Sequence, residues 1–280
     1  MGPNMYDNLN TKCNICGFVG GTVKRVISKP DRFELFLGAE PTKYTRVWVS
    51  CDKCFSGYRF VPSYIESQLP TISTEYYNID FKDSSLMEKY QRIMSLNISD
   101  NELRVKRIVQ FISDQVNDSI DREDFTLLDV GSGLGVFPSR LRQNVKTRAW
   151  NMILCESDPI AHQHLVNLGF KSVINSRVEE VSGIEADLLT LNKVLEHTSK
   201  PSSLVEKLSV LLRRNGILYL EVPDAISMLN CRDDDNSLGI VHYNTYSISG
   251  LSFLLHEANF RILKIEQIHE PSGKFTIYAF

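Results

Sequence analysis

The 280-residue chain has no apolar run of the roughly 18 residues that a membrane-spanning helix requires. Its first residues also lack the basic stretch followed by an apolar stretch that marks a secretory signal peptide. A strong excess of one charge is missing as well, since the formal net charge is -3. A large nucleic-acid footprint normally appears as a strongly basic domain. We therefore expect a cytoplasmic globular protein with no membrane span, for which nucleic acid is a disfavoured partner.

Cysteine is scarce, and four of the six cysteines form two Cys-x-x-Cys pairs, Cys13/Cys16 and Cys51/Cys54. A two-residue gap lets a tight turn aim both sulfurs at one metal, and two such pairs complete a tetrahedral Zn²⁺ site. Because four thiolates leave no position for water, the zinc would be structural. Disulfides are disfavoured in a reducing cytosol, and a redox pair would be expected near a βαβ pattern, which surrounds neither pair.

The segment around these cysteines, residues 1–70, is expected to be a small β-rich, zinc-ribbon-like domain. Val23–Ser28 and Thr45–Ser50 have the composition of strands. The segment carries nine Lys/Arg and six Asp/Glu, and four thiolates on one Zn²⁺ nearly cancel that excess. We therefore favour a role as a lid or in substrate binding over a role in RNA binding.

The most informative motif is FTLLDVGSGLGV, Phe125–Val136. Its apolar start predicts a short buried strand, and a turn containing Gly131, Gly133 and Gly135 then leads into a helix. Glycines accept positive φ and let a ligand lie against the backbone, and the first amides of a helix are free to bind it. A dinucleotide-binding loop would need glycine at position 136, where valine stands.

Asp129 stands just before these glycines, and Asp-x-Gly-x-Gly-x-Gly resembles motif I of the class I S-adenosylmethionine (SAM) methyltransferases. The resemblance implies that Asp129 lies near the methionine end of SAM and that the glycine backbone passes beside it. It also implies that Glu156, at the end of the next expected strand (Trp150–Cys155), holds the ribose hydroxyls. Asn192, at the end of the fourth strand, is expected to contact the cofactor too.

The segment after that strand, which ends in Leu195-Glu196-His197, resembles the "LEH" segment of small-molecule methyltransferases, including those acting on nucleotide sugars. It follows a central strand, where ligands of an open α/β sheet are expected. We interpret His197 as a candidate general base and Glu196 as a residue that orients it or contacts substrate. The alternative is that the histidine only packs or caps.

Five further residues are candidates for contact with the acceptor. In the family that the chain resembles, helices just before motif I close over the SAM site, which implies roles for Tyr76 and Tyr77. Aromatic packing between these helices and the core is the alternative. The resemblance also places His242, Tyr243 and Tyr246 at the border of the acceptor pocket.

Three further predictions concern the elements between these motifs. A helical pattern starts near Ser84. A second helix is expected over Pro201–Arg213, ended by Asn215-Gly216 and followed by a strand at Ile217–Val222. Residues 225–244 have the composition of an irregular insertion.

The fold class expected is α/β: a Rossmann-like, seven-stranded class I methyltransferase sheet with a terminal antiparallel hairpin, plus the N-terminal zinc ribbon. The segments are residues 1–70, a helical connector or lid at 71–124, and the SAM-binding domain at 125–280. The expected function is SAM-dependent O-, N- or C-methylation of a small polar metabolite, with a sugar, a nucleotide sugar or a glycan intermediate favoured. An rRNA or tRNA methyltransferase and a non-catalytic zinc-ribbon interaction protein are the alternatives. The sequence does not fix the oligomeric state.

Overall fold

The computed structural model describes residues 11–81, 85–116 and 124–280. Among these residues, no helix has both the length and the apolar character needed to cross a bilayer. In chain order the helices (α), 3₁₀ turns (η) and strands (β) are β1 Gly21–Ile27, α1 Arg32–Phe36, β2 Arg46–Cys51, β3 Gly57–Phe60, α2 Ser63–Glu66, η1 Leu69–Thr71, α3 Ile72–Asp80, α4 Leu86–Met94, α5 Asp100–Val116, β4 Thr126–Val130, α6 Val136–Gln143, β5 Asn151–Glu156, α7 Pro159–Asn167, β6 Ser172–Asn175, η3 Val178–Glu180, β7 Ala186–Asn192, η4 Leu195–His197, α8 Pro201–Ser209, β8 Leu212–Pro223, α9 Ser227–Asn230, η5 Asn236–Leu238, β9 Asn244–Thr245, α10 Ile248–Glu257, β10 Ile265–His269 and β11 Phe275–Ala279.

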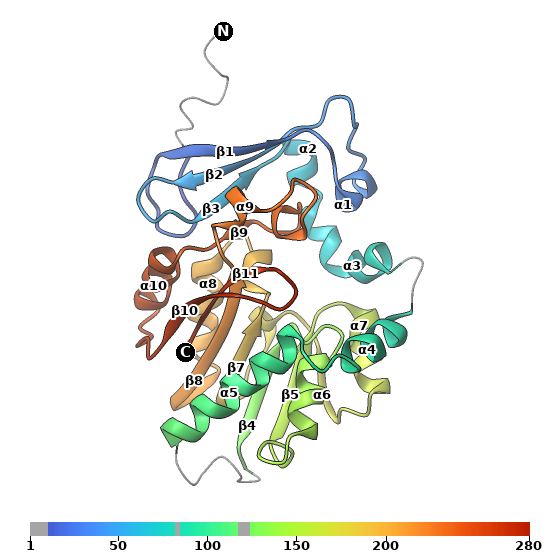
Figure 1. The fold of residues 1–280 in the computed structure, drawn as a ribbon, viewed down its shortest axis with the longest axis vertical. Coiled ribbons are helices and arrows are strands. Elements are labelled where there is room, and N and C mark those ends of the chain that lie inside the picture. The colour runs from blue at the N-terminus through green and yellow to red at the C-terminus, as the bar shows by residue number, and fades with distance from the viewer. Residues whose placement is uncertain (1–10, 82–84, 117–123) are drawn as a thin grey trace.

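The larger sheet has seven strands in the order β10-β11-β8-β7-β4-β5-β6. The five strands from β4 to β8 pair in parallel, and β11 pairs antiparallel with both β8 and β10. This is the Rossmann-like sheet with a terminal hairpin, so the predicted fold class is confirmed (Figure 1). A parallel sheet needs cover on both faces, which explains why its central strands are almost continuously apolar.

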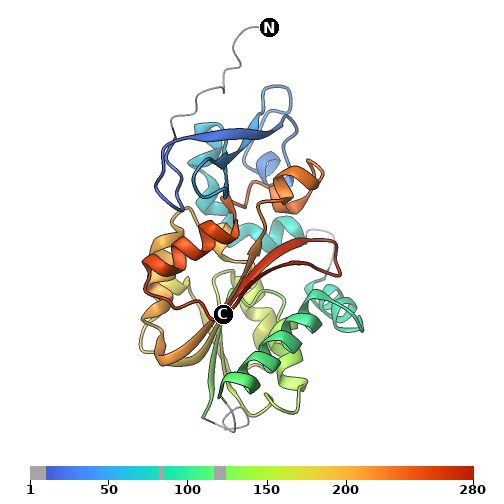
Figure 2. The same ribbon diagram turned by 60° about the vertical axis from the view of Figure 1, so that its left-hand side comes forward.

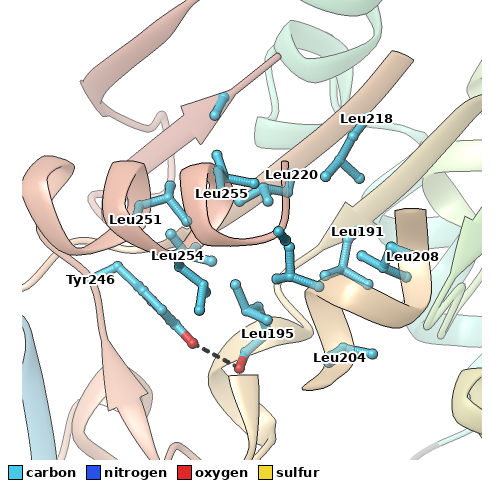
Figure 3. Close-up of a cluster of buried hydrophobic side chains, with 14 of the residues drawn as sticks. Leu191, Leu195, Leu204, Leu208, Leu218, Leu220, Tyr246, Leu251, Leu254 and Leu255 are labelled. Carbon is cyan, nitrogen blue, oxygen red and sulfur yellow. Dashed lines mark hydrogen bonds between the residues drawn. The ribbon is translucent and has the colours of Figure 1, made fainter. Parts of the chain in front are cut away.

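One face of this sheet packs against α8 and α10 through a leucine-rich core (Figure 3). The labelled members of this cluster are Leu191, Leu195, Leu204, Leu208, Leu218, Leu220, Tyr246, Leu251, Leu254 and Leu255. On the other face, Val105, Ile108 and Ile112 of α5 pack against Leu127 and Leu188 of the central strands. Burial of these two apolar layers fixes the sheet and the strand ends that carry the motifs.

The turn after β4 requires glycine at defined points. Gly131, Gly133 and Gly135 all have positive φ, at 68°, 54° and 70°, a region that side chains disfavour. A Cβ on Gly131 would also clash with Val194. Pro138 lies in the first turn of α6, where its missing amide hydrogen costs no helical hydrogen bond.

The smaller sheet has the order β1-β2-β3-β9, and β9 comes from the C-terminal half of the chain. Figures 1 and 2 show this sheet at one end of the molecule, next to α9. Two side chains of the small sheet reach into the segment that precedes β9. The Trp48 indole N–H donates to the Leu238 carbonyl at 3.1 Å, and the Arg25 guanidinium donates to the Met228 carbonyl at 2.6 Å. The cysteine-bearing sheet is therefore joined to the segment between β8 and β10 of the seven-stranded sheet.

Two of the element predictions differ from the structure. The helix expected over Pro201–Arg213 ends at Ser209, and β8 begins at Leu212 because that residue pairs with Ala186 at the start of β7. The Asn215-Gly216 signal thus marks an irregularity in the β7–β8 register, with Asn215 at φ 62°, and not the end of a helix. Residues 225–244, expected to be irregular, contain α9, η5 and the start of β9.

The helix expected from Ser84 is confirmed as α4 over Leu86–Met94. Its predicted start at Ser84 lies outside the described residues.

Candidate functional site

The carboxyl ends of β4, β5 and β7 border a cavity of about 640 Å³. The order of the strands reverses at β4, because β5 and β6 follow on one side of it and β7 and β8 on the other. Such a switch point is the usual place for a ligand in an open α/β sheet. Nine of the residues singled out from the sequence line it: Tyr76, Tyr77, Asp129, Gly131, Gly133, Glu156, Asn192, His197 and Tyr243. These nine predicted cofactor and acceptor residues therefore share one space, whereas Gly135, Glu196, His242 and Tyr246 do not line it.

Asp129 is buried at the floor of this cavity, with 2% of its surface exposed. The Thr190 hydroxyl donates to its Oδ1 at 2.6 Å, and the Asn192 side-chain amide donates to the same oxygen at 3.3 Å. Burial raises the pKa of Asp129 to about 6 because the charged form is poorly solvated there. The sequence reasoning did not single out Thr190, although a hydroxyl within an apolar strand was a signal available for it.

Glu156 ends β5 and faces the glycine turn. Its carboxylate accepts from the amides of Gly133 and Asp158, both at 2.9 Å. Each carboxylate oxygen has a second lone pair, so the group can still accept from hydroxyls. Asp158 caps α7, as expected for a short acidic residue before Pro159.

Tyr76 and Tyr77 reach the cavity from α3. A Cβ on Gly133 would lie 2.8 Å from the Tyr77 hydroxyl, so this side chain covers the glycine turn. The Tyr76 ring stacks on Phe33 and also meets His197 edge-on, with ring centroids 5.1 Å and 6.5 Å away. Both interpretations of these tyrosines thus have support, because the two rings pack between segments and also line the cavity.

This part of the cavity fits SAM on three observations. The glycine turn leaves backbone exposed where side chains would fill the space. Two buried carboxylates, Asp129 and Glu156, stand at adjacent strand ends. The Asn192 Oδ1 is buried without a hydrogen-bond partner among the described residues. An ammonium group and ribose hydroxyls are the donors that such a set of acceptors can bind.

Glu196 and His197 belong to the 3₁₀ turn η4 directly after β7. The His197 ring is exposed to the cavity, and its Nδ1 lies 3.0 Å from the Val241 carbonyl. Glu196 is only 1% exposed, and within the described chain neither of its carboxylate oxygens has a hydrogen-bond partner. Burial raises the pKa of Glu196.

His242 lies next to this pair although it does not line the cavity. Its ring is half-buried, its Nδ1 is 3.1 Å from the Ser237 carbonyl, and its ring centroid is 4.7 Å from that of His197. Burial lowers the pKa of His242 well below its ordinary value, which favours the neutral ring. One ligand atom from each of Glu196, His197 and His242 lies within 4.8 Å of the others.

Tyr243 lines the cavity with its ring under the Arg59 guanidinium, 4.3 Å from the ring centroid. Tyr246 and Gly135 lie elsewhere. Tyr246 is fully buried, and its hydroxyl donates to the Leu195 carbonyl at 3.0 Å (Figure 3). Gly135 begins α6 and faces Leu165. Neither residue lines the cavity.

Sequence reasoning missed a buried ion pair at the edge of the cavity. Arg104 of α5 donates through Nε to Glu221 of β8 at 2.8 Å, and both side chains are buried. Burial alone would raise the pKa of Glu221, but Arg104 holds it well below its ordinary range. The nearby Lys193 donates to Thr276 Oγ1 at 2.6 Å, and its backbone has a φ of 59°. A charged residue beside Val105 on the apolar stripe of α5 was the available signal for Arg104.

The four N-terminal cysteines form a second candidate site, away from the cavity. Sγ of Cys13 lies 3.8 Å from Sγ of Cys54, and Sγ of Cys16 lies 3.6 Å from Sγ of Cys51. All four sulfurs are within 4.8 Å of one another. A tetrahedron with Zn–S bonds of about 2.3 Å has S–S edges of about 3.8 Å, whereas a disulfide would need about 2.05 Å. The arrangement therefore fits a four-coordinate zinc ion.

A family profile described as a methyltransferase domain matches residues 97–265, which is more than half of the chain. The chain belongs to this methyltransferase family. It is a SAM-dependent methyltransferase with a class I domain. A search of curated proteins gives no significant match.

Several solved methyltransferase structures are similar to this methyltransferase. Magnesium protoporphyrin IX methyltransferase from Synechocystis PCC 6803 has 13% identity and a TM-score of 0.56, covering 75% of this chain and 97% of that one. The 1,6-didemethyltoxoflavin-N1-methyltransferase of Burkholderia thailandensis has 13% identity and a TM-score of 0.51, covering 84% and 94%. The plantazolicin methyltransferase BamL has 18% identity and a TM-score of 0.50, covering 72% and 77%. At these identities the similarity shows a shared fold.

Proposed function

We propose that this methyltransferase acts on a small polar acceptor, with a sugar, a nucleotide sugar or a glycan intermediate favoured. The observation that carries the proposal is that the cofactor residues and His197 line one cavity. Its walls include Tyr76 from the N-terminal half and Tyr243 from the segment before β9. Enclosure of this kind suits a small molecule better than a long polymer. Two of the similar structures are of enzymes named for toxoflavin and plantazolicin substrates.

Each residue has a separate task in this proposal. Glu156 holds the ribose hydroxyls, while Asp129 and Asn192 face the methionine end of SAM. When bound, SAM supplies an electrophilic methyl group on a sulfonium. His197 lies at the acceptor side, where its Nε2 can take the acceptor's proton while Nδ1–H donates to the Val241 carbonyl. The cavity walls also align the acceptor with the methyl group, which lowers the activation barrier further.

We also propose that the four cysteines bind a structural zinc ion. The support is their mutual spacing and the absence of a fifth ligand position in a four-thiolate site.

The proposed segments remain residues 1–70 around the zinc, 71–124 as connector and lid, and 125–280 as the SAM-binding domain. The small sheet includes β9, so the first and last segments would act as one structural unit.

Transfer from isotope-labelled SAM to a panel of sugars and nucleotide sugars tests the proposal. His197→Ala should lower turnover by about 10²–10⁴-fold and leave the SAM dissociation constant nearly unchanged. Glu156→Ala should weaken SAM binding sharply, as measured by calorimetry. His256→Ala, a change of an exposed histidine on α10, is the matched control. Unaltered turnover in His197→Ala, or no transfer to any member of the panel, would count against the proposal.

A further inference from the structure

The loop before β9 brings a second histidine against Glu196 and His197. The Tyr243 amide donates to the Glu196 carbonyl at 2.7 Å, and Nδ1 of His197 reaches the Val241 carbonyl at 3.0 Å. These contacts hold the loop on η4 from both sides of His242. One ligand atom from each of Glu196, His197 and His242 therefore comes within 4.8 Å of the others, although His242 lies far from the adjacent Glu196 and His197 in the sequence.

The hydrogen bonds of the two rings fix which nitrogen is free. Nδ1 of His197 and Nδ1 of His242 each face a backbone carbonyl, at 3.0 Å and 3.1 Å. A carbonyl oxygen only accepts, so in each neutral imidazole Nδ1 carries the hydrogen and Nε2 keeps its lone pair. Metal-binding histidines usually have this pairing, which sets both the tautomer and the ring orientation.

Glu196 provides an independent observation that points to a ligand. It is 1% exposed, and both carboxylate oxygens lack a hydrogen-bond partner among the residues described. A buried, unpartnered carboxylate is costly. Each neutral histidine adds one nitrogen lone pair to this carboxylate, and a ligand atom of each of the three residues lies within 4.8 Å of the others. A cation in their midst would satisfy all three groups.

We propose that Glu196, His197 and His242 bind a divalent transition-metal ion beside the acceptor cavity, separate from the four-cysteine site. Two imidazoles and one carboxylate suit ions such as Mn²⁺, Co²⁺ or Zn²⁺. Three protein ligands leave coordination positions of the ion open. Because His197 lines the cavity, these open positions would face the acceptor. An oxygen of the acceptor is the group that would fill them.

This inference rests on the proposed function for the identity of the acceptor, and it changes the role of His197 from base to metal ligand. Loss of turnover in His197→Ala fits either role, so the test has to measure metal directly. The purified chain is dialysed against Zn²⁺ and its metal content is measured. It should hold about two zinc ions per chain, one in each proposed site, and Glu196→Gln should hold about one. Mn²⁺ titration followed by the electron paramagnetic resonance signal of the free ion should show one site in wild type and none in Glu196→Gln, because the thiolate site disfavours Mn²⁺.

His242→Ala is the second variant and should also lose the Mn²⁺ site, while His256→Ala should keep it. Calorimetric SAM binding in every variant shows whether the fold and the cofactor site survive, and so separates this proposal from the proposed function. The proposal is overturned if wild type binds SAM but no Mn²⁺ and no second zinc ion. It is also overturned if Glu196→Gln binds both metals like wild type.

Discussion

Asp129 illustrates how one buried side chain links the fold to the cofactor. Its raised pKa of about 6 means that the cofactor-free native state keeps the proton of this carboxyl to a higher pH than the unfolded state does. As pH rises from about 4 to about 6, the unfolded carboxyl ionises first, so the stability of the cofactor-free protein falls. In the proposed cofactor site, however, the ionised carboxylate would be the form that attracts the positive charges of SAM.

The first prediction at this scale is that SAM binding tightens between pH 5 and pH 7. The expected change in dissociation constant is about 10-fold, because only about one tenth of Asp129 is ionised one pH unit below its pKa. Calorimetric titrations at several pH values measure the change. Asp129→Asn should bind SAM weakly and with little pH dependence. An equally steep pH profile in that variant would assign the titration to another group.

The residue positions that could be predicted depend on local patterns. Asp129 and Glu156 could be placed at the cavity because each lies at the end of a short apolar strand. The neighbourhood of His242 could not be foreseen from local pattern, since it depends on the loop before β9 folding onto η4. The buried pairing of Arg104 with Glu221 depends in the same way on how α5 packs on the sheet.

At the scale of elements, the cysteine pairs act through the sheet that they border. Cys51 ends β2, and the carbonyl of Cys54 accepts from the Ser249 hydroxyl at the start of α10 at 2.8 Å. β3 then pairs with β9, whose first residue follows Tyr243 of the cavity wall. The cysteine-bearing turns thus support the wall of the cavity that Tyr243 lines.

The element-scale prediction is that Cys13→Ser lowers the metal content and the thermal stability together. Purified wild type, after brief chelation to strip weak sites, should retain about one zinc ion per chain. The variant should retain none and unfold at a lower temperature, while its SAM affinity stays near wild type because Glu156 is in another part of the fold. Metal analysis and differential scanning calorimetry measure both effects. A structural zinc site would be disproved if purified wild type held no zinc and melted at the same temperature as Cys13→Ser.

For the whole molecule, the order of the seven strands was predictable because the glycine turn identifies the first strand of a known arrangement. The association of β9 with the N-terminal sheet was not, since Asn244 and Thr245 carry no strand signal of their own. Their pairing comes from tertiary contacts such as that between Trp48 and Leu238. A tertiary contact also explains why α8 was predicted too long. Leu212 pairs with Ala186 of β7, so β8 begins within the segment expected to be helical.

The central claim is that the cofactor and the acceptor share the cavity above β4, β5 and β7. A crystal structure with bound S-adenosylhomocysteine tests it most directly. We predict both ribose hydroxyls within hydrogen-bond distance of Glu156 and the cofactor sulfur facing the side of the cavity that His197 lines. A cofactor bound elsewhere, or a sulfur directed away from His197, would contradict the account.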